Sequence, residues 1–152
     1  MKLTALFASG LGLFAWAASA MPLEERDDEA PQTVHLTFHG GPASYNLTLL
    51  ADGNYYQTNN ELSVSIIEAP DYNAFYQCQF ETVNEATLAS SISPAGVNQI
   101  LVGPPTPITA VRCEGMCVHT WGECYRNNQY VGPCCSGYCA ATRCRPWVYT
   151  TV

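Results

Sequence analysis

The sequence predicts a mainly β protein, in which a small antiparallel β sandwich or barrel is followed by a disulfide-rich C-terminal module. Short runs of β-branched and aromatic residues alternate with turn signals through the middle of the chain, and only one short segment reads as helical. Six of the eight cysteines fall within 28 residues. The chain has 152 residues, of which 47% are hydrophobic and 12% charged. This composition indicates one folded domain or two small ones rather than disorder.

Residues 1–20 have the features of a secretory signal peptide. Lys2 precedes an apolar run from Leu3 to Ala18, and the triplet ending at Ala20 is a small-x-small cleavage site. A transmembrane anchor is the alternative, but the run is shorter than the roughly 20 apolar residues that a span needs. We therefore expect a secreted, extracellular protein with no membrane span in the rest of the chain.

An acidic leader, residues 21–32, follows the expected cleavage site. Its first ten residues, MPLEERDDEA, carry five acids and one arginine. A segment so charged has little to bury, so we expect it to be flexible. In the whole chain 13 acidic residues outnumber 6 basic ones, which argues against a nucleic-acid partner. We expect the protein to be a monomer.

A β-rich domain is expected over residues 33–113, with short strands spaced as in a sandwich or barrel. Asp52-Gly53 is a strong hairpin turn pair, and Gly103-Pro104-Pro105 separates the last two strands. The only plausible helix runs from Glu85 to Ser91. The expected strands are Thr33–Phe38, Ser44–Leu50, Asn54–Gln57, Leu62–Ile67, Ala74–Phe80, Val97–Val102 and Ile108–Arg112.

Two polar features of this domain have alternative interpretations. Asn46-Leu47-Thr48 is the one N-glycosylation sequon, and Asn46 is either glycosylated or carries a sequon that is never used. His35 and His39 would share one face of a strand, so a metal pair is conceivable. No third ligand has suitable spacing, and we therefore expect ordinary surface histidines and no metal.

The C-terminal cysteines follow the pattern C-x6-C-x9-CC-x3-C-x4-C from Cys117 to Cys144. Such density is typical of a chain that is cross-linked because it is too short to build a core. Six cysteines allow fifteen pairings, and spacing alone does not choose among them. A structural zinc site is the competing interpretation, but exported chains oxidise their thiols, and adjacent cysteines are poor tetrahedral ligands. If these six pair among themselves, Cys78 and Cys113 remain, and their bond would stabilise the domain by about 4 kcal/mol.

A resemblance narrows the pairing. The cysteines of this segment, with Gly132-Pro133 before the adjacent pair and Ser136-Gly137-Tyr138 after it, resemble those of an inhibitor cystine knot. Similar runs occur in knottin-type antimicrobial peptides and in toxins. The resemblance covers about a fifth of the chain and implies a knottin-like module over residues 114–147, followed by a tail of residues 148–152. It implies the disulfides Cys117–Cys135, Cys124–Cys139 and Cys134–Cys144.

The chain as a whole also resembles the small secreted cysteine-rich proteins of filamentous fungi. The resemblance rests on the order of signal peptide, acidic leader, β domain and cysteine-rich tail, and on the run from Val102 to Ile108 that leads into Val111-Arg112-Cys113. It implies an effector-like role at a host or cell-wall surface, not a reaction.

Catalysis finds little support in the sequence. Only three histidines could act as a base, none lies in a recognisable motif, and every cysteine is assigned to a disulfide. No phosphate loop, dinucleotide fingerprint or metalloprotease helix is present. We therefore expect no enzyme activity and no cofactor.

Binding through the loops of the C-terminal module is the expected function, because preorganised loops lose little entropy on binding. An extracellular protein is the expected partner. The alternatives are a protease inhibitor that offers Arg126 or Arg143, a binder of cell-wall glycan, and an antimicrobial or toxin-like precursor, which a net charge of only +1 in residues 113–152 disfavours. Trp121 and Trp147 could instead pack against the β domain. The expected binding residues are of types enriched at interface hot spots: Trp121, Tyr125, Arg126, Tyr130 and Tyr138.

Overall fold

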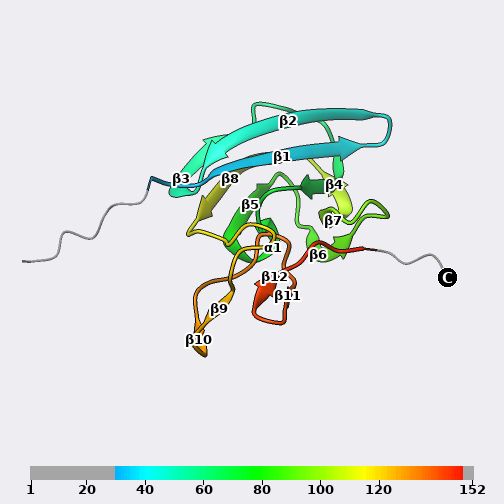
Figure 1. Cartoon of the computed structure of the whole chain (residues 1–152). Coiled ribbons are helices and arrows are strands. Elements are labelled where there is room, and N and C mark those ends of the chain that lie inside the picture. The colour runs from blue at the N-terminus through cyan, green and yellow to red at the C-terminus, as the bar shows by residue number, and fades with distance from the viewer. Residues whose placement is uncertain (1–29, 149–152) are drawn as a thin grey trace, which may run out of the picture.

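Antiparallel strands dominate the computed structural model, which describes residues 30–148 (Figure 1). The mainly β class is therefore confirmed. The expected signal peptide lies outside the described residues, as do all but the last three residues of the acidic leader and all but the first of the C-terminal tail.

A five-stranded sheet has the order β2-β1-β4-β7-β6, and a three-stranded sheet has the order β3-β8-β5. All pairs within these two sheets are antiparallel. One short helix, α1, directly precedes β5. The elements are β1 Thr33–Gly40, β2 Ala43–Leu50, β3 Asp52–Gln57, β4 Val64–Ala69, α1 Ala74–Gln77, β5 Cys78–Thr82, β6 Thr87–Ile92, β7 Asn98–Thr106 and β8 Ile108–Glu114.

Strand β1 follows directly from its sequence pattern. Val34, Leu36 and Phe38 alternate with polar residues, and all three are buried, because alternate side chains of a strand point to opposite faces. Gly40 pairs with Ala43 of β2, so only two residues form the turn between the strands. The first of them, Gly41, has a φ of +61°, as a tight hairpin turn of this kind requires.

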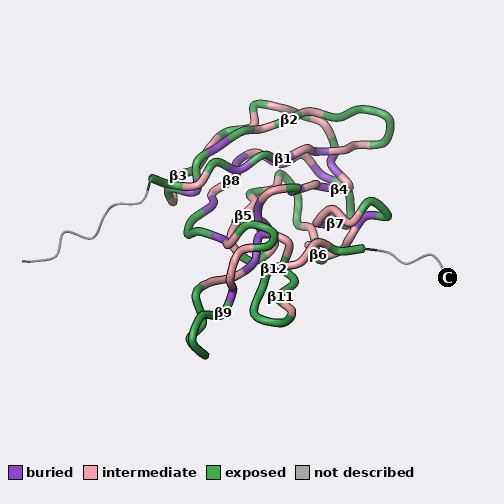
Figure 2. Tube along the Cα trace, viewed as in Figure 1, coloured by how far each residue is buried: buried purple, intermediate pink, exposed green. Residues whose placement is uncertain are grey.

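One hydrophobic core draws on residues of both sheets. Ile67 and Ile100 from the five-stranded sheet belong to the same buried cluster as Ile108 and Val111 from the three-stranded sheet. Figure 2 shows these buried stretches in the middle of the β region, with exposed chain around them. The disulfide Cys78–Cys113 joins β5 to β8 at directly paired positions.

The helix expected from Glu85 to Ser91 is wrong. Residues Thr87–Ile92 form the edge strand β6, which pairs along its length with β7 from Thr87↔Gly103 to Ile92↔Asn98. The segment contains threonine, two serines and isoleucine, which are at best moderate helix formers, and pairing with β7, the next strand along the chain, decides its conformation.

Three further local expectations need correction. Asp52-Gly53 is not a hairpin turn: Gly53, with a φ of +78°, lies at an irregularity of β3, where the chain passes from one sheet to the other. The expected strand Ala74–Phe80 begins as the helix α1 and becomes β5 at Cys78. The prolines after Gly103 do not end β7, which continues to Thr106 because the register shifts at this point and leaves both prolines without a paired partner.

Residues 114–148 fold differently from the β region. They contain two short hairpins, and each strand of these hairpins has two residues. In the first, β9 (Tyr125–Arg126) pairs with β10 (Gln129–Tyr130). In the second, β11 (Cys139–Ala140) pairs with β12 (Arg143–Cys144). Their buried cluster consists of three cysteines with Val118 packed against them. In Figure 1 this segment lies below the sheets, on the side of α1. Cross-links therefore take the place of an apolar interior here.

Candidate functional site

All eight cysteines form disulfides, and the three in the C-terminal segment are Cys117–Cys135, Cys124–Cys139 and Cys134–Cys144. These are the pairs that the resemblance implies. The sulfur atoms of Cys124, Cys134 and Cys144 lie within 4.8 Å of one another. Because each is bonded to another sulfur, they form a cross-linked centre and not a set of thiolate metal ligands.

Hydrogen bonds from side chains of the β region to the backbone of the C-terminal segment attach this segment to the β region. The hydroxyl of Tyr72, a completely buried residue, donates to the carbonyl oxygens of Glu114 and Gly115 at 3.0 and 2.8 Å. Burial, and secondarily the charge of Glu114, raises the pKa of Tyr72 to about 12. The hydroxyl therefore stays a donor at physiological pH.

Two amide side chains hold the first disulfide of the segment against the sheets. The backbone N–H of Cys117 donates to Gln32 Oε1 at 3.0 Å, and Asn98 Nδ2 donates to the Cys135 carbonyl at 2.7 Å. Both cysteines are buried and belong to the core cluster of the β region. The loops beyond this disulfide therefore project from a fixed base.

Glu123 organises the exposed cations of the C-terminal segment. Arg126 Nε donates to Glu123 Oε2 at 2.7 Å, and Arg143 lies 3.5 Å from the other carboxylate oxygen. The hydrogen bond from Arg126 and the positive charge of Arg126, followed by that of Arg143, lower the pKa of Glu123. Arg143 also donates to the Trp121 carbonyl at 2.9 Å, so this carboxylate links two loops.

Trp121 is displayed on the surface at the first loop of the segment. Its side chain is 56% exposed, and its backbone adopts a φ of +74°. The guanidinium of Arg145 lies 4.9 Å from its ring centre, a distance at which a cation is attracted by the ring face. The alternative that Trp121 packs against the β domain is therefore wrong.

The hairpin of β9 and β10 displays two aromatic rings side by side. Tyr125 and Tyr130 are 43% and 59% exposed, and their rings meet edge to face with centres 5.3 Å apart. The turn between the strands is Asn127-Asn128, both with positive φ, which is the conformation that asparagine tolerates best after glycine. This pair of asparagines is a sequence signal that could have located the hairpin.

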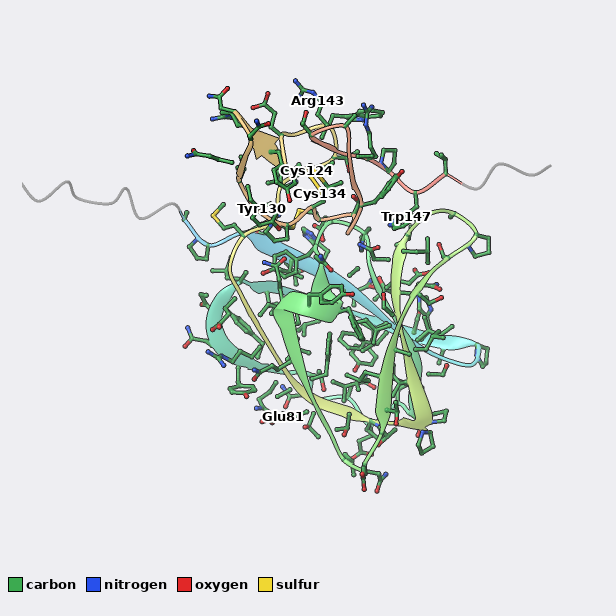
Figure 3. The ribbon with its side chains drawn as sticks, turned by 90° about the horizontal axis from the view of Figure 1, so that it is seen from below. Glu81, Cys124, Tyr130, Cys134, Arg143 and Trp147 are labelled. Carbon is green, nitrogen blue, oxygen red and sulfur yellow. A yellow bond between two sulfur atoms is a disulfide. The ribbon has the colours of Figure 1, made fainter. Side chains whose placement is uncertain are left out.

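Tyr138 does not share contacts with the other expected binding residues. Its ring stacks on that of Trp147, with centres 4.7 Å apart, and Trp147 Nε1 donates to the Ser136 carbonyl at 2.7 Å. Trp147 lies where the C-terminal segment meets the β region (Figure 3), and a Cβ atom added at Gly96 would overlap its carbonyl. Tyr138 therefore belongs to the junction between the two parts.

The two histidines on β1 contact different carboxylates. His35 Nδ1 lies 2.5 Å from Asp71, and His39 Nε2 lies 3.2 Å from Glu68. Within residues 30–148, the three bridged cysteines are the only group of three or more candidate metal ligands whose ligand atoms come together. Asn46 on β2 is exposed and accepts a hydrogen bond from Thr37.

The geometry brings Trp121, Tyr125, Arg126 and Tyr130 onto the loops around Glu123. Sequence reasoning missed Glu123 and Arg145, because their roles depend on contacts that the disulfides create. Together these features define a disulfide-cross-linked, mainly β protein with an exposed aromatic and cationic surface. Comparison with protein-family models, curated proteins and solved structures gives no match to this chain. No helix in the described part of the chain is long and apolar enough to cross a membrane.

Proposed function

We propose that this chain is a secreted, disulfide-stabilised binding protein that displays the loops of its C-terminal module, residues 114–147, to an extracellular protein partner. It acts by docking and without catalysis, in the manner of an effector at a host or cell-wall surface. Four disulfides in so small a protein support an extracellular location, since such bonds persist in oxidising compartments.

The proposal includes a cystine knot. Two disulfides, Cys117–Cys135 and Cys124–Cys139, close a ring with the backbone between their cysteines. The third disulfide, Cys134–Cys144, supports a threaded arrangement, because its two sulfur atoms lie within 4.8 Å of the Cys124 sulfur. A knot of this kind would fix the loops that it carries.

The proposal also includes a β sandwich as the base of the module. One buried cluster contains residues of both the five-stranded and the three-stranded sheet, which is the expected packing of two sheets face to face. The single cluster is consistent with a rigid sandwich that carries the knot. The hydrogen bonds of Tyr72 and Asn98 attach the knot to this sandwich.

The observation that carries the proposal is the exposure of aromatic rings on loops that are themselves fixed. Trp121 and Tyr130 are 56% and 59% exposed, yet disulfides and the contacts of Glu123 restrain the loops on which they stand. Large aromatic side chains and arginine dominate the binding energy of protein interfaces, and restraint before binding reduces the entropy lost on docking.

Protease inhibition has less support from the geometry. Arg126 and Arg143, the two arginines that could enter a trypsin-like pocket, are both paired with Glu123. An inserted arginine would have to leave this carboxylate, whereas an arginine that lies flat against a partner can keep it. Inhibition of trypsin with nanomolar affinity would overturn this preference.

The test uses matched aromatic variants of the full secreted chain. Wild type, Trp121→Ala, Tyr130→Ala and Tyr76→Ala are immobilised and exposed to extracellular fluid from the protein's surroundings, and retained proteins are identified by mass spectrometry. Tyr76 is a suitable control because it is 76% exposed but lies on α1, outside the module. We expect a protein that wild type and Tyr76→Ala retain and that both module variants lose.

Quantitative binding of that protein then follows by calorimetry. Truncation of a central aromatic residue should weaken binding at least about thirtyfold, the effect of a hot spot of roughly 2 kcal/mol. Retention that is equal for all four proteins would contradict docking through the module. Steady turnover of a substrate, lost on replacement of one acid or histidine, would contradict the absence of catalysis.

A further inference from the structure

A cavity of about 290 Å³ lies where the C-terminal module meets the β region. Helix α1 and strands β6 and β7 provide one side, and Ser136, Gly137 and Trp147 provide the other. In Figure 3, Trp147 marks this junction, and Arg143 lies farther out on the module. The volume is close to the lower end of small-molecule sites, which begin at about 300 Å³.

The cavity is lined by uncharged groups, and one of them is the side-chain amide of Asn73. Asn73 is 9% exposed and lines the cavity. Its backbone carbonyl accepts from the N–H groups of Tyr76 and Gln77, but its side chain makes no capping hydrogen bond to α1. None of the side-chain hydrogen bonds found among residues 30–148 satisfies this amide. The amide can therefore donate to and accept from a ligand in the cavity.

Strands β6 and β7 add polar residues to the lining. Asn98 uses its amide nitrogen on the Cys135 carbonyl, which leaves its carbonyl oxygen as an acceptor. Ser90 lines the cavity from the edge strand β6, where it is paired with Ile100 of β7, which also lines it. The lining therefore combines polar and apolar residues.

Two aromatic rings border the cavity. Tyr76 is 76% exposed, and its ring meets that of Phe75 edge to face at 5.1 Å. Trp147 is 37% exposed, and its orientation is fixed by the stack on Tyr138 and by the hydrogen bond from its indole to Ser136. The negative face of such rings attracts C–H groups that carry partial positive charge, as the flat faces of a pyranose do.

We propose that this cavity binds one or two residues of a neutral oligosaccharide. The ligand is neutral because the lining contains no ionisable carboxylate or basic side chain to compensate a buried charge. It is polyhydroxylated because hydroxyl groups can pair with the Asn73 amide, which an apolar ligand would cover and leave unpaired. This site is separate from the protein-docking loops around Glu123 and goes beyond the function proposed for them.

The test is a titration of the full chain, labelled with nitrogen-15, with three neutral tetrasaccharides and one charged one. The neutral probes are the tetramers of β-1,4-linked N-acetylglucosamine, β-1,4-linked glucose and β-1,3-linked glucose, and the charged probe is tetragalacturonate. At least one neutral probe should shift the Trp147 indole N–H and the Tyr76 amide signals saturably. The Trp121 indole signal should stay in place.

Matched variants connect the shifts to the cavity. Tyr76→Ala and Asn73→Ala should each weaken binding about tenfold, the usual effect of losing one contact of roughly 1.4 kcal/mol. Tyr130→Ala, on the distant hairpin, should bind as wild type does. Tyr76 is exposed, so its variant keeps the test valid even where Asn73→Ala does not fold.

Three results would overturn the proposal: no saturable shift with any neutral probe in the millimolar range, tighter binding of tetragalacturonate, or shifts confined to Trp121 and Tyr130. The last result would place glycan binding on the docking loops instead. Because the protein-retention experiment depends on Tyr130 and not on Tyr76, and this one has the reverse dependence, failure of either proposal is distinguishable from failure of the other.

Discussion

Removal of a single hydroxyl at Tyr72 tests whether the module is held to the β region by the contacts described above. Tyr72 is 0% exposed, and its hydroxyl donates to the carbonyls of Glu114 and Gly115 at 3.0 and 2.8 Å, where β8 ends and the module begins. Tyr72→Phe keeps the ring and leaves both carbonyls without this donor. The loss of a buried hydrogen bond should reduce the free energy of unfolding by about 1–2 kcal/mol.

Urea denaturation at pH 7, with all disulfides intact, measures this change. The control is Tyr55→Phe, because the Tyr55 side chain is 49% exposed and its hydroxyl donates to Gln79 at 3.2 Å on the surface. The control should change the free energy of unfolding by less than about 0.5 kcal/mol. Equal effects of the two substitutions would refute the role assigned to the Tyr72 hydroxyl.

The same residue predicts an alkaline loss of stability. The pKa of Tyr72 is raised to about 12 in the folded protein, against about 10 in an unfolded chain. Between these values the folded state holds a proton that the unfolded state has lost, so the free energy of unfolding falls as pH rises from about 10 to 12. Tyr72→Phe should make this fall less steep. A slope as steep as that of wild type would show that other groups cause it.

Three further predictions concern the backbone and the ion pairs. Gly96→Ala should reduce the free energy of unfolding by about 2 kcal/mol, because the new Cβ would overlap the Trp147 carbonyl at a φ of +79°; Gly137→Ala, at a similar φ with open space around it, is the matched control and should lose less. The double substitution Ala141→Asn with Thr142→Gly should raise the free energy of unfolding by about 1–2 kcal/mol. Both residues of the turn between β11 and β12 have positive φ, a conformation that costs ordinary side chains energy. An unchanged or lower midpoint of thermal unfolding would contradict this prediction. A carbon-13 NMR titration should find the Glu123 carboxyl below the ordinary pKa of about 4.3, with Arg126→Ala moving it upward.

The parts of the fold that follow from the sequence are those that local pattern decides. The alternation of Val34, Leu36 and Phe38 is sufficient to predict β1 and its buried face. The composition of Glu85–Ser91 does not indicate a strand, because its strand character comes only from pairing with β7, which follows it after a turn. Asp52-Gly53 has the composition of a hairpin turn, but the partner of β3 is β8, far along the chain.

The sequence predicts which types of residue form the candidate site, but it does not predict which of these residues contact one another. The sequence predicts exposed aromatics and arginines on the module, and Trp121 and Tyr130 are exposed. That Glu123 would meet both Arg126 and Arg143 depends on the disulfides that bring two loops together. The cavity beside Asn73 is likewise formed by elements from four parts of the chain, so no local pattern could have indicated it.

The interior of the module is filled by disulfides and not by large side chains, which explains why its aromatic residues are exposed. In the β region, large rings such as those of Phe38 and Tyr72 are buried in the core. In the module, three cysteines and Val118 fill the interior, and the cross-links supply the restraint that burial supplies elsewhere. Trp121, Tyr125 and Tyr130 are therefore not needed for packing, and their exposure has a cost in water unless a partner covers them. Replacing them by polar residues should leave the stability of the module nearly unchanged while abolishing docking, which is the opposite of the outcome for Phe38.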